Sequence, residues 1–283
     1  MTGPDDPPTT ATAGSATAGS ATARSDVKAC CAAAYSSDVV ALLLGDSYHP
    51  GGIALTRRLA DGLALCEGDR VLDVACGRGT TALLLADAYG ARVDGVDYSS
   101  ANTALAQAAA SAAGLAARTA FTTGDAERLP FPDGVFDAVV CECALCTFPD
   151  KPRAAAEFAR VLRPGGRVGL TDVTVGTDRL PPELTGLAAR IACIADARSQ
   201  AEYEATFEGT GLRTVLTEGH DQAMSRMIDQ IEARLNLLCL TAADQVADAG
   251  VDLAAAPAVL AAARIAVAEG GLGYSLLVAE KIV

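Results

Sequence analysis

The stretch from Asp69 to Ser99 contains two short apolar segments separated by a glycine-rich turn and a helical pattern. VLDVA (71–75) has the length and apolar character of a buried parallel strand, and ARVDGVD (91–97) forms a second such segment that ends at an aspartate. Between them, TTALLLADAYG (80–90) has the spacing of an amphipathic helix closed by a glycine. This order of strand, loop, helix and strand predicts the start of a doubly wound α/β sheet.

The turn CGRG (76–79) indicates a binding function for this unit. Gly77 and Gly79 let the backbone approach a ligand where a Cβ atom would collide, and the helix N-terminus beyond them can bind a negative group. Asp97, 20 residues after Gly77, is placed to accept hydrogen bonds from ribose hydroxyls. With Ala82 in third place, the same spacing also satisfies the G-x-G-x-x-G/A dinucleotide fingerprint, so this segment alone leaves the cofactor open.

Three further features favour S-adenosylmethionine over a dinucleotide. Asp73 lies inside the end of the first strand, where the ammonium of a methionine moiety could pair with it. Asp125 follows a predicted third strand and is able to reach an adenine amino group. An exposed connector (129–137) and a fourth strand (138–140) come next, and residues 154–173 then read as a helix, a Pro-Gly-Gly turn and a fifth strand.

The ordered motifs LDVACGRG, GVDYS, GDAERLPF, FDAVVCECAL and LRPGGRV, within residues 68–175, resemble the class I S-adenosylmethionine-dependent methyltransferases. The resemblance implies a Rossmann-like methyltransferase fold, with a doubly wound, seven-stranded, mostly parallel sheet and a helical cap and insertion. It also implies S-adenosylmethionine as the cofactor. The cofactor contacts that it assigns are Asp73, Ala75, Gly77, Gly79, Asp97, Tyr98, Asp125, Ala126 and Cys141.

CECALCTFPDK (141–151) places three thiols at the end of the fourth strand, the edge at which α/β sheets bind ligands. In an extended stretch, the side chains of Cys141 and Cys143 point to the same side, and Cys146 leads into the following helix. Cysteine is also a small apolar residue that packs in cores. A structural zinc ion needs about four ligands, so this C-x-C-x-x-C pattern allows zinc without requiring it.

Other thiols occur at Cys30, Cys31 and Cys193, and three thiolates around a soft trivalent centre are chemically sensible. This arrangement resembles the arsenite methyltransferases. CECALCTFPDK fits that family's SNCVINLSPDK around Cys143, and CIADARSQAEYEATFEGTGL (193–212) resembles its CIAGAL…EEY…GF segment. The resemblance implies metalloid-ligand roles for Cys143, Cys193 and Cys31, with Cys30 and Cys146 as alternates for the third ligand.

The sequence therefore predicts a methyltransferase that methylates thiolate-bound trivalent arsenic in a detoxification role. Trivalent arsenic carries a lone pair and needs no general base, which agrees with a chain of only two histidines. Two alternatives remain open. In a methyltransferase of an ordinary small organic acceptor, His49 could serve as a base for a hydroxyl or an amine. In a non-catalytic module, the thiols would bind a metalloid or zinc without turnover.

Composition limits the partners and the location. The formal charge of −13 argues against nucleic acid, and no apolar run approaches the roughly 20 residues of a membrane span. We expect a cytoplasmic protein with a small-molecule or metalloid substrate, room for a thiol reductant, no resident metal beyond that substrate metalloid, and an oligomeric state left open. We expect a disordered tail (1–25) and one methyltransferase domain (26–283), made of an N-terminal helical segment (26–67), a cofactor-binding core (68–175), a substrate cap (176–211) and a helical insertion (222–271).

Overall fold

The structure is a computed structural model that describes residues 28–29, 32–33, 35–36, 38–45, 48–176, 180–184, 194, 196–241 and 254–282. The predicted disordered tail (1–25) lies outside the described residues. The same holds for three of the predicted metalloid ligands, namely Cys30, Cys31 and Cys193.

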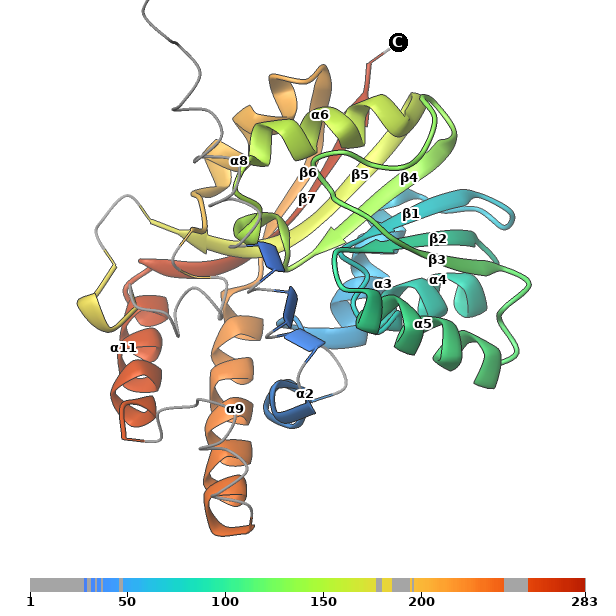
Figure 1. The fold of residues 1–283 in the computed structure, drawn as a ribbon. Coiled ribbons are helices and arrows are strands. Elements are labelled where there is room, and N and C mark those ends of the chain that lie inside the picture. Colours follow the sequence, from blue (N-terminus) through green and yellow to red (C-terminus); the bar gives the residue numbers. More distant parts are fainter. Residues whose placement is uncertain are drawn as a thin grey trace, which may run out of the picture.

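A seven-stranded sheet with helices on both faces forms the centre of the molecule (Figure 1). The strand order is β3-β2-β1-β4-β5-β7-β6, in which β1 to β5 pair in parallel and β7 runs antiparallel to both of its neighbours. The predicted doubly wound, mostly parallel sheet is therefore confirmed. The strands are β1 (Arg70–Val74), β2 (Arg92–Asp97), β3 (Thr119–Thr123), β4 (Phe136–Glu142), β5 (Leu162–Val175), β6 (Leu212–Gly219) and β7 (Leu272–Lys281).

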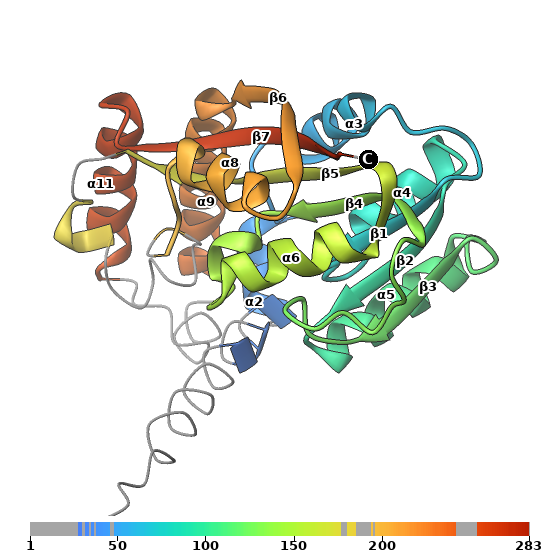
Figure 2. The same ribbon diagram turned by 90° about the horizontal axis from the view of Figure 1, so that it is seen from above.

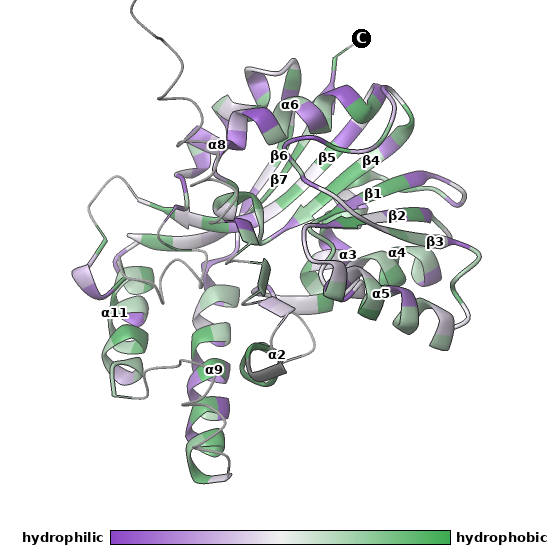
Figure 3. Ribbon diagram, viewed as in Figure 1, coloured by the Kyte–Doolittle hydropathy of each residue, from purple (hydrophilic) through white to green (hydrophobic). Residues whose placement is uncertain are grey.

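Helices cover the two faces of the sheet and divide the core in two. One face carries α3 (Gly52–Leu63), α4 (Thr80–Ala88) and α5 (Ser100–Ala112), and the other carries α6 (Lys151–Val161) and α8 (Gln200–Glu208). Successive strand residues alternate between these faces, so that Val71 and Val140 pack on the α3 and α4 side while Leu72 and Val139 pack on the α6 and α8 side. Burial on both faces explains the nearly continuous apolar runs of the central strands, which Figure 3 shows along β4.

The remaining helices lie beyond the carboxyl ends of the strands. They are α2 (Asp38–Leu44), α9 (Asp221–Thr241), α11 (Ala256–Ala268) and two short 3-10 turns, η1 (Leu145–Thr147) and η2 (Pro182–Leu184). In sequence, α9 and α11 stand between β6 and β7. In both views they lie side by side, away from β2 and β3 (Figures 1 and 2). None of the described helices is long and apolar enough to cross a bilayer.

The boundaries agree with local sequence signals, with one difference. The predicted start near Gln200 is confirmed, because Ser199 and Glu202 form a capping box at the beginning of α8. The predicted Pro-Gly-Gly turn is instead an irregularity within β5. Leu162 pairs with Phe136 and Arg167 pairs with Ala138, so the residues around Pro164 bulge out of the ladder. Proline has no amide hydrogen to donate there, which favours such a bulge.

Gly95 in β2 offers a test of this packing. A Cβ atom at Gly95 would lie 2.5 Å from Cδ1 of Phe121 and 3.0 Å from Sγ of Cys76. We therefore expect Gly95→Ala to lower the free energy of unfolding by about 1–3 kcal/mol, measured by urea denaturation. Gly219→Ala is the matched control, since a Cβ there meets no atom within 4 Å, and it should change stability by less than about 0.5 kcal/mol. Equal effects of the two substitutions would contradict the packing argument.

Candidate active site

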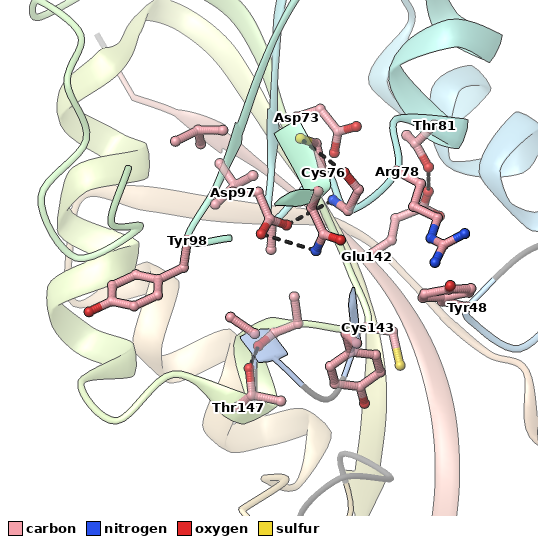
Figure 4. A pocket seen from close by; sticks show the side chains of 18 of the residues that line it. Tyr48, Asp73, Cys76, Arg78, Thr81, Asp97, Tyr98, Glu142, Cys143 and Thr147 are labelled. Atoms are coloured by element: carbon pink, nitrogen blue, oxygen red, sulfur yellow. Dashed lines mark hydrogen bonds between the residues drawn. The ribbon is translucent and has the colours of Figure 1, made fainter. Parts of the chain in front are cut away.

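A cavity of about 710 Å³ lies at the carboxyl ends of β1, β2 and β4 (Figure 4). The strand order reverses between β1 and β4, and α/β sheets bind ligands in the crevice at such a switch point. Seven of the nine predicted cofactor contacts line this cavity: Asp73, Ala75, Gly77, Asp97, Tyr98, Asp125 and Ala126. The fold thus brings together residues that are up to 53 positions apart (73 to 126) in the sequence.

The turn between β1 and α4 takes its shape from backbone conformations that favour glycine. Ala75, Gly77 and Gly79 have φ values of 57°, 52° and 86°. A Cβ at Gly77 would meet no protein atom within 4 Å, so this part of the cavity wall leaves space for a ligand. Gly79 does not line the cavity. It caps the N-terminus of α4, and a Cβ there would lie 2.9 Å from that of Ala106.

Asp97 connects this turn to the end of β2. Its Oδ2 accepts a hydrogen bond from the Gly77 amide at 2.9 Å, while Oδ1 accepts from the Ser99 amide at 2.8 Å and from Nδ2 of Asn102 at 3.3 Å. Burial raises the pKa of Asp97, and these three donors act in the opposite direction. The carboxyl is thereby fixed at the wall where ribose hydroxyls are expected.

Asp73 is the most isolated carboxyl of the cavity. It is only 2% exposed, and its Oδ2 has no hydrogen-bond partner in the part of the chain that the structure describes. Burial raises the pKa of Asp73 well above its usual value, and the negative charge of Glu142 raises it further. A buried carboxyl of this kind is a favourable place for a cationic group of a ligand.

Asp125 already has a cationic partner from the N-terminal segment. Nζ of Lys28 lies 2.9 Å from both carboxyl oxygens of Asp125 and 2.6 Å from Oε2 of Glu127. Burial alone would lower the pKa of Lys28, but the bonds and charges of these two acids outweigh it and leave the pKa raised. Ser36 also contacts Ser99, with 2.8 Å between their hydroxyl oxygens. Lys28, Ala32 and Tyr35 therefore add to the cavity wall, with Lys28 at the end where adenine is expected.

Glu142 belongs to the cavity wall, although the sequence did not single it out. Its carboxyl accepts hydrogen bonds from the hydroxyls of Thr81 at 2.6 Å, Thr56 at 3.1 Å and Thr171 at 3.3 Å. Nε2 of His49 lies 3.6 Å away. These partners come from α3, α4, β5 and the loop before α3, so spacing along the chain could not reveal them.

His49 lines the cavity, yet both of its ring nitrogens lie near protein atoms. Nδ1 is 3.2 Å from the carbonyl oxygen of Pro50, and Nε2 is 3.3 Å from the hydroxyl of Thr56. A general base needs a nitrogen that reaches the proton of the acceptor. This arrangement therefore favours a role in holding Thr56 and Glu142.

The three clustered thiols do not converge. Cys143 lines the cavity with a φ of 52°, so the chain is not extended there, and the predicted same-side arrangement of Cys141 and Cys143 is wrong. The side chain of Cys141 packs in the core on the α6 and α8 side, and burial raises its pKa well above the usual value. Cys146 packs on the opposite side, and neither of these two side chains lines the cavity. Among the described residues, no three metal-ligating side chains form a metal site.

Residues 71–166 match the family model described as a methyltransferase domain. The chain is 34% identical over 171 residues to the methyltransferase GfsG of Streptomyces halstedii, covering 59% of this chain and 61% of that protein. It is 32% identical over 234 residues to the 27-O-demethylrifamycin SV methyltransferase of Amycolatopsis mediterranei, covering 80% and 82%. The chain belongs to the class I S-adenosylmethionine-dependent methyltransferases. Its cofactor is S-adenosylmethionine.

A solved structure agrees with this fold. The geranyl diphosphate C-methyltransferase of Streptomyces coelicolor, in complex with S-adenosyl-L-homocysteine, superposes with a TM-score of 0.68 at 18% identity, covering 81% of this chain and 79% of that one. Within the present cavity, the unpartnered oxygen of Asp73 and the open space at Gly77 fit a cofactor with a cationic amino-acid end.

Asp73 should reduce the stability of the protein when no cofactor is bound. Because its pKa is raised in the folded state, the folded protein binds more protons than the unfolded chain above about pH 4, and this carboxyl weakens stability as pH rises. We expect Asp73→Asn to raise the free energy of unfolding by about 1–2 kcal/mol at pH 8 and to have little effect at pH 4. Urea denaturation at both pH values measures this difference.

Asp87→Asn is the matched control for that measurement, since Asp87 lies exposed on α4. It should change stability by less than about 0.5 kcal/mol at either pH. If the gain from Asp73→Asn were the same at pH 4 and pH 8, the buried charge would not be its cause.

Proposed function

We propose that the protein transfers a methyl group from S-adenosylmethionine to a hydroxyl group of an apolar small organic molecule. The observation that carries this proposal is the set of apolar and aromatic side chains that line the cavity together with the cofactor residues. They include Leu42, Tyr35, Tyr48 and Phe148, and the rings of the two tyrosines lie 6.3 Å apart at an angle of 34°. Such a wall suits an apolar acceptor, with a few polar groups to orient it.

The relatives support a hydroxyl as the acceptor group. The protein from Amycolatopsis mediterranei, by its name, methylates an oxygen of a demethylrifamycin, and the match to it extends over most of both chains. A phenolic or enolic hydroxyl would require the least help, because a phenol with a pKa near about 10 loses its proton readily.

The arsenite interpretation has less support. No thiol cluster forms among the described residues, and of the five cysteines assigned to the metalloid only Cys143 lines the described cavity. The side chain of Cys146 is in the core, and Cys30, Cys31 and Cys193 lie outside the described residues. The compared relatives carry no metalloid in their names. The alternative of an ordinary organic acceptor therefore agrees better with these observations.

In this mechanism the protein acts through position and exclusion of water. When bound, S-adenosylmethionine supplies a methyl group activated by its sulfonium. Asp97 and Asp125 hold the ribose and adenine ends, and the N-terminal segment closes over them through Lys28. The apolar side chains would orient the acceptor with its oxygen toward the methyl group, and such orientation can contribute several kcal/mol. A phenolic or enolic acceptor releases its proton to bulk water before it binds, so that the reacting oxygen is an oxyanion.

The test uses S-adenosylmethionine labelled in its methyl group and a panel of phenols, aliphatic alcohols, amines and arsenite. We expect label in an organic methyl ether, identified by mass spectrometry. Phe148→Ala should raise KM for that acceptor about tenfold, through lost apolar contact, and leave the Kd of S-adenosylmethionine unchanged. Label found only in methylated arsenic, and lost in Cys193→Ser, would overturn the proposal in favour of arsenite. Label confined to amines would also overturn it.

A further inference from the structure

Glu142 is a buried carboxyl for which the mechanism above has no use. Its side chain is only 5% exposed, although it stands at the end of β4, beside a cavity that is open to ligands. Burying a charged group is unfavourable unless it is paired, and an uncharged side chain of similar shape could pack there instead. The position therefore calls for a physical reason to keep an acid.

The carboxyl of Glu142 accepts hydrogen bonds from three hydroxyl groups. Oε2 accepts from Thr81 and Thr56 at 2.6 and 3.1 Å, and Oε1 lies 3.3 Å from the hydroxyl of Thr171. Hydrogen bonds donated to a carboxylate stabilise its charge and fix its orientation. His49 lies on the same side, in contact with Thr56. Four elements of the fold thus hold the carboxyl of Glu142 in one orientation at the cavity wall.

A second observation points to the ligand. Oδ2 of Asp73 is buried, lines the same cavity and has no hydrogen-bond partner among the described residues. Asp73 pairs with Val140 across β1 and β4, and Glu142 follows two residues later, so the two carboxyls lie on the same face of neighbouring strands. The charge of Glu142 accordingly raises the pKa of Asp73. Lys28 is bound to Asp125 and Glu127 at another part of the wall, and Arg78 also lines the cavity. A ligand cation that contacts both Asp73 and Glu142 would relieve the repulsion between their charges.

We propose that Glu142 and Asp73 together bind the ammonium group of the methionine part of S-adenosylmethionine. Glu142 is then a cofactor-binding residue, and Thr56, Thr81 and Thr171 are positioning residues that hold its carboxyl. The sequence alone had assigned this ammonium to Asp73. The role of Glu142 depends on the cofactor and not on the acceptor, so it stands whether the methyl group goes to a hydroxyl or elsewhere.

The affinities of the cofactor and its analogues distinguish ammonium binding by Glu142 from other roles of this residue. We would measure Kd by calorimetry, using the full chain, for four ligands: S-adenosylmethionine, S-adenosylhomocysteine, decarboxylated S-adenosylmethionine and 5′-methylthioadenosine. The first three carry the ammonium, and the last lacks it. Glu142→Gln should weaken the first three about 10- to 100-fold, the usual effect of a lost charged hydrogen bond. It should change the Kd of 5′-methylthioadenosine less than about twofold.

Three further variants serve as controls. Asp125→Asn alters the adenine end of the wall and should weaken all four ligands to a similar degree. Thr81→Val removes the shortest hydrogen bond to Glu142 and should weaken the three ammonium ligands selectively, though by less than Glu142→Gln. Thr81→Ser restores a hydroxyl and should recover most of this loss, which tests the positioning role even if Glu142→Gln does not fold.

Each possible pattern of Kd changes leads to a different conclusion about Glu142. Selective weakening of the three ammonium ligands by Glu142→Gln supports the proposal. Equal weakening of all four would mean that Glu142 only shapes the cavity, and it would overturn the proposal. Weakening of S-adenosylmethionine and its decarboxylated form alone would place Glu142 near the sulfonium and would also overturn it. Unchanged binding of all four would assign the acid to the acceptor or to folding, and the proposal would again be wrong.

Discussion

The hydrogen bond from the Gly77 amide to the Asp97 carboxyl is the contact on which the cavity depends. It joins the turn after β1 to the end of β2 at a length of 2.9 Å, and Asp97 in turn accepts from the start of α5. The Cys76 amide also donates to the Val96 carbonyl at 3.1 Å, so two bonds hold the glycine turn against the second strand. Because this carboxyl is buried, the energetic cost of losing a partner is high, and the geometry of the wall is correspondingly well defined.

The sequence could predict those features that depend on residues close together along the chain. Gly77, Gly79 and Asp97 lie within one β-loop-α-β unit, where the conformational freedom of glycine and the alternation of strands determine their placement. Glu142 and Lys28 are different, since their partners lie 86 and 97 positions away, at Thr56 and Asp125. No spacing rule predicts such pairs, because they exist only after the sheet has brought its strand ends together.

The φ angle of Cys143 explains why the predicted clustering of Cys141 and Cys143 is wrong. An extended chain would have placed Cys141 and Cys143 on one face, but the left-handed conformation of Cys143 separates them. A non-glycine residue in that conformation costs about 1 kcal/mol or more, and such strain is often found beside binding sites. The sequence Cys-Glu-Cys gives no sign of this left-handed conformation. The same resemblance that correctly predicted the cofactor and the sheet therefore gave no guide to the way these sulfur atoms point.

The position of Lys28 has a consequence for how the chain can be shortened. Its ammonium pairs with two acids, Asp125 and Glu127, at the cavity wall. A protein trimmed ahead of Ser36 would keep its sheet and its glycine turn, yet it would expose a pair of mutually repelling carboxylates. Helical residues far ahead of the first strand thus contribute a side chain to the cavity wall.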